Sequence, residues 1–238
     1  MQTVSALYTQ IMEGLHYFET KLEIEGVGTI LPNQIFSITT NAKMFERNPE
    51  IGKAVSSEID CKVEKPNTKI PRMAKVEVFT RVCNATQHSE WLPQGVFYVD
   101  TREENVDRSG LKAVKFHGFD AMLKAEQPFQ SDQITGDSTD VQMVAEIARI
   151  IGVEVDGRTF DVMGNRYTIP LPTGYSCREV LGYIASMYVG SFVITDDGKL
   201  RLVSLLEIPP ETNLLVTEDG DVILFGDTAI LVERGEET

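Results

Sequence analysis

The sequence predicts a mainly β fold, an antiparallel barrel or sandwich that carries a small two-helix α+β insertion. Two observations predict it. Before residue 118, apolar and polar residues alternate along several short segments, as they do in strands with one buried face. After residue 129, apolar residues follow the helical period, and two capping motifs begin helices. Strands of parallel sheets are apolar throughout, so the alternation favours an antiparallel sheet.

The first region begins with a short helix and continues as strands. Apolar residues at helical spacing predict the helix within residues 3–14, and Gly14 is placed to end it. Strands are then predicted around Leu22–Ile24, Ile59–Val63 and Val76–Val82, where apolar side chains point to one face and charged ones to the other. These strands are the framework of the first domain.

A hairpin is predicted at the end of this region. Gly95–Arg102 and Leu111–His117 have the composition of strands, and they bracket the polar turn Glu103–Gly110. The residues Val96–Val99 are apolar in succession, so both faces of this strand should be covered. We therefore expect this strand to contact another chain, as part of self-association or of a ring.

A domain boundary is predicted near residue 128. Asp120–Glu126 makes one or two helical turns, Pro128 ends them, and the polar stretch Gln130–Ser138 is a connector. The chain is thereby divided into three parts: an N-terminal barrel-like domain at 1–128, an α+β insertion at 129–204, and C-terminal strands at 205–238 that return to the first domain or lead to a second barrel.

The insertion is predicted to hold two helices and a hairpin. Thr139–Gln142 is a capping box, whose side chains bond free backbone N–H groups at the start of a helix that runs to Gly152. Ser176–Glu179 is a second capping box, and it opens a helix to about Tyr188. Ser191–Val203 follows as a β-hairpin with an acidic turn.

Composition excludes several classes of function. The chain has 22 basic and 36 acidic residues, for a net charge of −14. Binding nucleic acid needs clustered Lys and Arg, so we expect no sequence-specific nucleic-acid partner. No run approaches the roughly 18 apolar residues that span a bilayer, and the first residues lack the features of a signal peptide. We expect that the chain does not insert into a membrane. We also expect that it is made in the bacterial cytoplasm.

Cysteine and histidine spacing indicates no local metal motif. Cys61, Cys83 and Cys177 are odd in number and show no C-x-x-C pair, so neither a disulfide framework nor a thiolate zinc site is indicated. We interpret them as small buried hydrophobic residues. The histidines are scattered, and only the fold could bring them together. They are His16, His88 and His117. We assign no metal-ligating or cofactor-binding residue and expect no cofactor.

Two groups of residues resemble catalytic ones. Cys177 lies near the start of a predicted helix, where the dipole favours a thiolate. No His or Asn is close to it in sequence, so we interpret it as a neighbour of the structural cap. An acidic cluster beside Arg102 could act as a carboxylate pair in sugar hydrolysis, but charge clusters are common in turns, and we interpret it as a solvated hairpin tip. Its members are Asp100, Glu103 and Glu104.

Two further motifs are interpreted as structural. Asp219 and Asp221 partly match a calcium loop, but the full ligand ladder is missing, and a turn explains them. Trp91 is near Phe97 and Tyr98, so an aromatic platform for carbohydrate is conceivable, whereas core and interface roles are commoner. We assign no catalytic residue and predict that the chain is not an enzyme.

Five stretches of the chain carry a family resemblance: Ile70–Phe79, Gln94–Arg102, Lys115–Glu126, Arg178–Ala185 and Phe192–Val203. They resemble tail proteins encoded by prophages of Gram-positive bacteria, which belong with the baseplate-hub proteins of long-tailed phages and related contractile injection machines. The resemblance spans most of the chain and lies in its strands and helices rather than in a catalytic motif.

The resemblance implies a homotrimeric hub in the virion tail, whose subunits each carry two similar β-barrels and an α+β domain inserted into the first. Such a hub joins the tail tube to the tail tip, lines the central passage, and contacts tail tube, distal tail, and tip or fibre proteins. A second barrel is not evident in this chain. The alternatives are a tail-associated cell-wall hydrolase or its anchor domain, and a carbohydrate-binding β-sandwich module.

Overall fold

The computed structural model describes residues 4–42, 50–106, 112–164, 167–205, 224–225 and 228–229. The chain divides into two compact units, 1–205 and 206–238. In the second unit, the short strands β13 (Leu224–Phe225) and β14 (Thr228–Ala229) form an antiparallel pair. Most of the predicted C-terminal strand region 205–238, including the turn at Asp219 and Asp221, lies outside the described residues.

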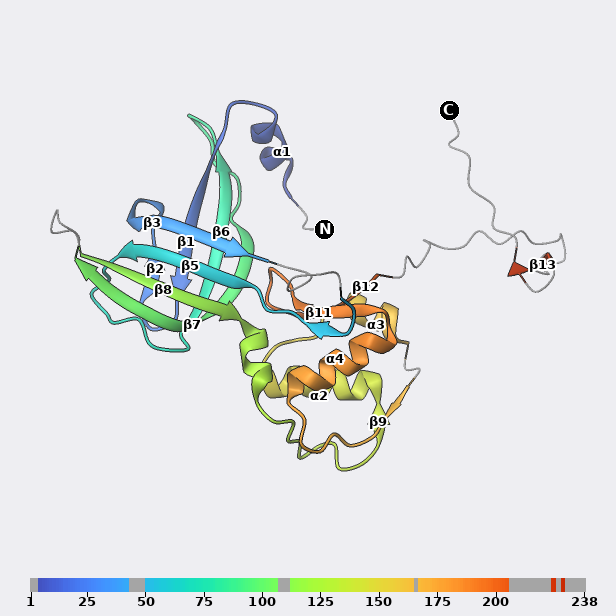
Figure 1. The fold of residues 1–238 in the computed structure, drawn as a ribbon. Coiled ribbons are helices and arrows are strands. Elements are labelled where there is room, and N and C mark those ends of the chain that lie inside the picture. The colour runs from blue at the N-terminus through green and yellow to red at the C-terminus, as the bar shows by residue number, and fades with distance from the viewer. Residues whose placement is uncertain are drawn as a thin grey trace. The chain divides into compact units, whose positions relative to one another are not determined.

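A seven-stranded sheet forms the first part of the larger unit (Figure 1). Its strands stand in the order β2-β1-β6-β7-β8-β5-β3, and each neighbouring pair is antiparallel, as the sequence predicts. The helix α1 (Ala6–Met12), capped by Ser5, precedes the sheet and contacts β6. The strands are β1 (Tyr17–Ile24), β2 (Gly28–Ile30), β3 (Ile35–Asn41), β5 (Glu58–Glu64), β6 (Lys75–Cys83), β7 (Leu92–Val106) and β8 (Lys112–Asp120), with the 3-10 turn η1 (Pro32–Gln34) between β2 and β3.

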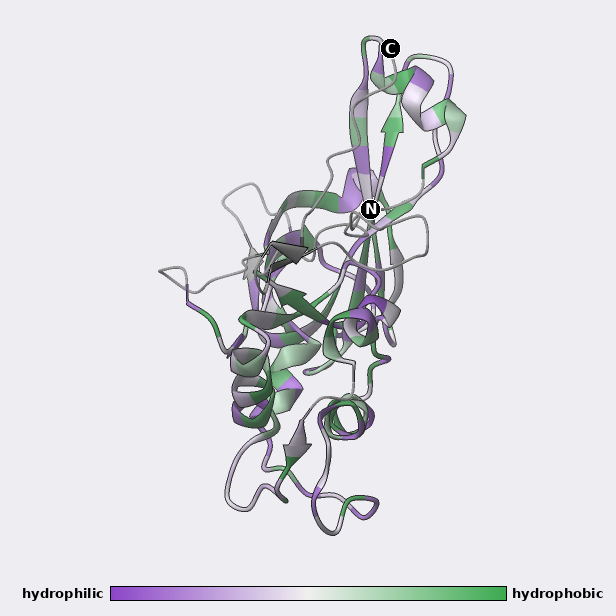
Figure 2. Cartoon of the chain, turned by 90° about the vertical axis from the view of Figure 1, so that its right-hand side faces the viewer, coloured by the Kyte–Doolittle hydropathy of each residue, from purple (hydrophilic) through white to green (hydrophobic). Residues whose placement is uncertain are grey.

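The sheet curls around its own apolar core. Alternate residues of each strand are buried, as Ile59, Cys61 and Val63 are on β5, and the alternation appears as green and purple bands along the strands in Figure 2. Ile30 of edge strand β2 and Ile38 of the opposite edge strand β3 both pack against this one core. The sheet is therefore an antiparallel barrel left open between its edges.

The hairpin of β7 and β8 extends further than predicted. Glu103 pairs with Lys115 and Glu104 with Val114, so these two glutamates belong to β7, and the prediction of a turn that begins at Glu103 is wrong. The ladder shifts register between Val99 and Thr101, and such a bulge increases the local twist of a strand. Cross-strand packing of a long ladder outweighs the low strand propensity of adjacent glutamates.

The α+β region contains three α-helices rather than the predicted two. Both capping boxes are confirmed, since Thr139 caps α2 (Asp140–Ile151) and Ser176 caps α4 (Cys177–Met187). The additional helix is α3 (Gly157–Met163), which Asp156 caps. The 3-10 helix η2 (Ala121–Glu126) leads into this region, and the short strands β9 (Ser138–Thr139) and β10 (Thr168–Ile169) pair beside α2. Helices and sheet enclose a second apolar cluster.

A segment from the first region completes the sheet of the second (Figure 1). The predicted hairpin is confirmed as β11 (Gly190–Ile194) and β12 (Leu200–Ser204), and β4 (Lys53–Ala54) pairs in parallel with β11. Arg178 on α4 donates from Nε to the Ala54 carbonyl at 2.8 Å. Gly182 permits close packing here, because a Cβ on it would lie 2.8 Å from the Gly52 carbonyl oxygen.

The buried Asp120 side chain stabilises the junction between the curled sheet and the α+β region through hydrogen bonds. Its carboxylate accepts hydrogen bonds from the backbone N–H of Ser57 at 2.6 Å, the backbone N–H of Met122 at 2.9 Å and the Ser56 hydroxyl at 2.9 Å. These bonds hold the end of β8, the start of η2 and the chain before β5 together. Burial raises the pKa of this carboxyl group, while the donated hydrogen bonds oppose that change.

The apolar strand Val96–Val99 is covered within the chain. Phe97 and Val99 belong to the core of the sheet, whereas Tyr98, which is 9% exposed, belongs to the core of the α+β region. The turn at Gly198 lies against Val96, since a Cβ on that glycine would be 3.1 Å from a Val96 methyl group. Packing within the chain therefore explains most of this apolar run and leaves only Val96 partly exposed. Contact of this strand with another chain stays a prediction.

Candidate functional site

Cys177 lies at the first position of α4 and is fully buried. Burial raises the pKa of its thiol to about 11, which disfavours the thiolate that a nucleophile requires. The geometry agrees with a structural position beside the Ser176 cap.

The acidic residues of β7 do not converge. Arg72 donates to Asp100 at 3.2 Å, and Lys65 forms a short ion pair with Glu104 that lowers the pKa of that carboxyl group. Glu103 and Glu104 are consecutive in a strand, so their side chains point to opposite faces. They cannot act on one bond as an acid and base pair.

Trp91 is covered by cations rather than by other rings. The guanidinium of Arg81 lies 4.4 Å from its ring centroid, and the ammonium of Lys21 lies 5.3 Å away. Phe97 and Tyr98 are buried in two separate cores. These aromatic residues therefore form no common platform for a sugar. Asp219 and Asp221 lie outside the described residues.

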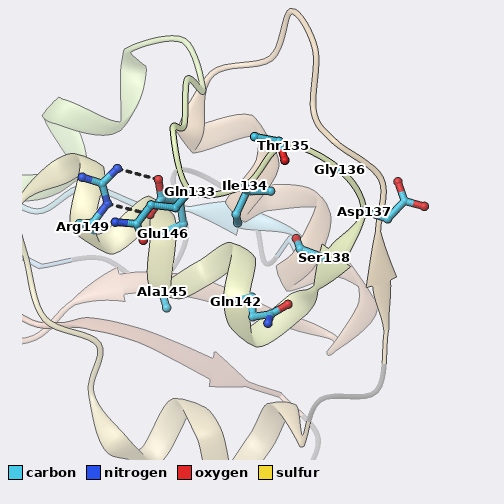
Figure 3. A pocket seen from close by; sticks show the side chains of 10 residues that line it. All are labelled: Gln133, Ile134, Thr135, Gly136, Asp137, Ser138, Gln142, Ala145, Glu146 and Arg149. Carbon is cyan, nitrogen blue, oxygen red and sulfur yellow. Dashed lines mark hydrogen bonds and ion pairs between the residues drawn. The ribbon is translucent and has the colours of Figure 1, made fainter.

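A surface pocket lies between α2 and the loop before it (Figure 3). In this view Arg149 and Glu146 face each other, and their bidentate ion pair has two N···O distances of 2.7 Å. Glu146 also accepts from Ser131, and Arg149 donates to Asp132 at 2.9 Å. The hydrogen bond from Arg149 lowers the pKa of Glu146. Glu146 and Arg149 therefore hold the loop before α2 against this helix through their contacts with Ser131 and Asp132.

The fold brings together three potential metal ligands, namely Glu19, Cys83 and His88, which we call the Glu19–Cys83–His88 cluster. Their ligand atoms all lie within 4.8 Å of one another. The other histidines lie elsewhere: His117 is 3.4 Å from Asp60, and the ring of His16 is 2.8 Å from the Gly14 carbonyl.

Strand register and one turn build this cluster. On β1 and β6, Glu19 pairs with Arg81, and two positions along the ladder Tyr17 pairs with Cys83, so Glu19 and Cys83 share a face. Cys83 and His88 form a β-bridge across the turn between them. The Asn84 side chain shapes that turn by accepting from the backbone N–H groups of Thr86 at 2.9 Å and Gln87 at 2.8 Å.

Arg81 sets the electrostatics of the cluster. Its Nε and Nη2 atoms both donate to Glu19 Oε2, at 2.9 Å and 2.7 Å. These bonds lower the pKa of the Glu19 carboxyl group. Burial, reinforced by the negative charge of Glu19, raises the pKa of the Cys83 thiol. The cluster therefore combines the carboxyl group of Glu19, the thiol of Cys83 and the ring of His88.

The sequence analysis missed this cluster because Glu19 is remote from the other two residues. The signal that could have found part of it is the spacing of Cys83 and His88, with four residues of turn-forming composition between them. Only the register of β1 against β6 adds the third ligand.

Apolar side chains are exposed near the start of the chain. Leu15, between α1 and β1, is 98% exposed, and Phe18 on β1 is 53% exposed. Isolated exposed apolar residues are normal, but several within one short segment indicate a contact surface. We call this set the N-terminal apolar segment; it consists of Val4, Met12, Leu15, Tyr17 and Phe18.

Comparison with known proteins finds similarity at the level of structure. No family model and no curated protein sequence matches the chain. The chain superposes on the 43 kDa tail protein of prophage MuSo2 from Shewanella oneidensis with a TM-score of 0.54, at 15% identity, over 85% of this chain and 58% of that one. It superposes on a tail protein from Neisseria meningitidis MC58 with the same TM-score of 0.54, at 11% identity, over 84% of this chain and 54% of that one.

The two TM-scores show a shared fold, and at identities of 15% and 11% the likeness shows the fold alone. The chain spans a little more than half the length of either tail protein. Among the described residues, no helix is long and apolar enough to cross a membrane.

Proposed function

We propose that the chain is a structural, non-catalytic component of a phage-type tail, a hub-like subunit that joins the tail tube to the tail tip. The observation that carries this proposal is the fold shared with the MuSo2 prophage tail protein and the Neisseria tail protein, which extends over 85% and 84% of this chain. It includes the curled sheet and the α+β region together, and this combination is more specific than either part alone.

The chemistry of the described residues supports a role without turnover. The candidate nucleophile Cys177 is buried, and Glu103 and Glu104 point apart. A net charge of −14 suits a subunit that lines a passage for DNA, because an acidic wall repels phosphate instead of holding it. The proposed location is the virion tail, with other tail proteins as neighbours.

The N-terminal apolar segment is the proposed contact surface between copies in a homotrimer. Its five exposed apolar residues lie within one short stretch of the chain, and Leu15 and Phe18 are its most exposed members. Edge strand β3 offers a second means of association, because its outer backbone groups face no strand of the described sheet. Burying apolar side chains at such a surface stabilises the trimer.

Light scattering coupled to size-exclusion chromatography tests this proposal. The chain is expected to elute as a trimer, and the double variant Leu15→Asp, Phe18→Asp as a monomer, because two buried charges are costly at an apolar interface. The matched control is Leu171→Asp, which changes an exposed leucine of the α+β region and should remain trimeric. A monomeric wild-type chain, or a double variant that stays trimeric, would contradict the proposed contact.

Purified cell wall provides the test against the hydrolase alternative. The chain is expected to release no soluble muropeptides above the level of a buffer control. Release that disappears on replacing Glu103 or Glu104, and persists on replacing Lys112, would overturn the non-catalytic assignment.

A further inference from the structure

We propose that the Glu19–Cys83–His88 cluster binds one zinc-class divalent cation. This inference is independent of the role in a tail, and it revises the expectation of no metal site, which rested on local sequence motifs.

The donor set matches the chemistry of zinc. Thiolate sulfur, imidazole nitrogen and carboxylate oxygen are the three side-chain ligand types of Zn²⁺, with bond lengths of about 2.3, 2.0–2.1 and 2.0–2.2 Å. Two atoms bound to one tetrahedral ion at these lengths lie about 3.5 Å apart. The ligand atoms already lie within 4.8 Å of one another. The remaining difference has to be closed by movement of the ligand side chains, of which that of His88 is exposed.

Two features preorganise the ligands. Cys83 and His88 flank a turn held by the Asn84 side chain, so their separation is fixed by backbone structure. Arg81 places both of its hydrogen bonds on Glu19 Oε2, so it does not occupy Oε1. Such outer partners orient metal-binding carboxylates. Arg81 is itself held in place by its contact with the Trp91 ring.

The charge balance is favourable despite the nearby arginine. When the sulfur–zinc bond forms, the Cys83 thiol gives its proton to solvent, so the ion's two positive charges meet a thiolate and the Glu19 carboxylate. The site as a whole, Arg81 included, gains one positive charge. The chain carries a net charge of −14, so this gain occurs in a protein that attracts cations.

Three protein ligands leave one coordination position open. In the isolated chain a water molecule would fill it, as in zinc sites with three side-chain ligands. The proposal assigns binding at this position and no reaction.

Cobalt titration of the metal-free chain tests the site, because Co²⁺ adopts the zinc geometry and reports a bound thiolate by absorption. We expect near-ultraviolet sulfur-to-cobalt charge transfer and tetrahedral visible bands that saturate at one ion per chain, and that added Zn²⁺ abolishes both. The variant Cys83→Ser should lose the charge-transfer band, and His88→Ala should weaken Co²⁺ binding. The control His117→Ala should bind as the wild type does, since His117 lies beside Asp60.

Each other result counts against the site. A wild-type chain with no charge-transfer band would leave the cluster as an ion pair of Glu19 with Arg81 beside a buried thiol. A band that persists in Cys83→Ser would assign the thiolate to another cysteine. Equal weakening in His88→Ala and His117→Ala would indicate nonspecific binding.

Arg81 is a positioning residue in this proposal, and Arg81→Gln tests that role. Loss of outer partners typically weakens metal affinity by about 10–100-fold. We expect a loss of that size for Co²⁺ with the charge-transfer band retained, because the three ligands remain. An unchanged affinity would show that Arg81 does not orient Glu19.

Discussion

The curled sheet and the α+β region achieve their stability differently. The core of the sheet consists of apolar residues, and most of them are buried because they alternate along a strand. Ile70 and Ala74 reach it from the loop before β6, and the buried polar residues Ser89 and Asp120 lie beside β6 and at the end of β8. The α+β region buries polar side chains as well, and each has a specific role. Thr159 accepts a hydrogen bond from the Leu202 backbone, Asp140 accepts from the Val141 backbone, and Asp156 caps α3. The apolar core of the sheet should tolerate replacement of one apolar residue by another of similar volume. The core of the α+β region should tolerate it less, because each buried polar group needs its own hydrogen-bond partner.

The α+β region also limits the surface of the sheet that is left for assembly. The α+β region covers Tyr98 and the outer side of β7, so the part of the sheet that it shields is lost as a contact surface. The N-terminal apolar segment remains exposed.

Truncating one large side chain in each core should produce the largest effect. Phe116→Ala in the sheet and Phe192→Ala in the α+β region, both fully buried, should each lower the free energy of unfolding by about 3–5 kcal/mol through lost burial and a cavity. Chemical denaturation measures this loss. Hydrogen exchange should accelerate mainly in the altered region. Equal acceleration in both regions would show that they share one cooperative core.

Removing the junction carboxylate should have the next largest effect. Asp120→Ala leaves the backbone N–H groups of Ser57 and Met122 without their acceptor in a buried position. Each unsatisfied group costs about 1–3 kcal/mol, so the free energy of unfolding should fall by about 2–6 kcal/mol. A loss below 1 kcal/mol in denaturation would mean that Asp120 does not fasten the junction.

The pH dependence of Asp120 sharpens this prediction. Its pKa is raised by burial in the folded chain, so its contribution to stability is full below the unfolded pKa of about 3.9 and declines as pH rises through the folded value. The stability advantage of the wild type over Asp120→Asn should therefore shrink as pH rises above about 4. An advantage that grows over this range would contradict the raised pKa.

The smallest effect is expected at the start of α3. The hydrogen bond from Arg158 lowers the pKa of Asp156 to about 2. The resulting stability is present above the unfolded pKa of about 3.9 and is lost as pH falls through the folded value. Because the Arg158 side chain is 46% exposed, Arg158→Gln should cost about 1 kcal/mol or less at neutral pH. Thermal melts should show that this difference vanishes near pH 2.

Local patterns predicted much of this fold. The capping boxes at Thr139 and Ser176 need only four residues each, and both begin helices as predicted. The alternation of Ile59, Cys61 and Val63 likewise predicts a buried face without knowledge of the partner strand.

Features that depend on distant pairing were missed. The helix α3 is seven residues long and lacks an apolar stripe, since Phe160 is 41% exposed. The strand β4 is two residues long and is recognisable only from its parallel partner β11. The Glu19–Cys83–His88 cluster depends on the register of β1 against β6. A sequence shows local periodicity, but not which remote strands become neighbours.

A cryo-electron microscopy reconstruction of the tail proposed to contain this chain tests the central claim most directly. The account predicts three copies around the central axis between tube and tip, with Leu15 and Phe18 buried between neighbouring copies. A chain located away from the axis, or with both side chains facing solvent, would contradict it.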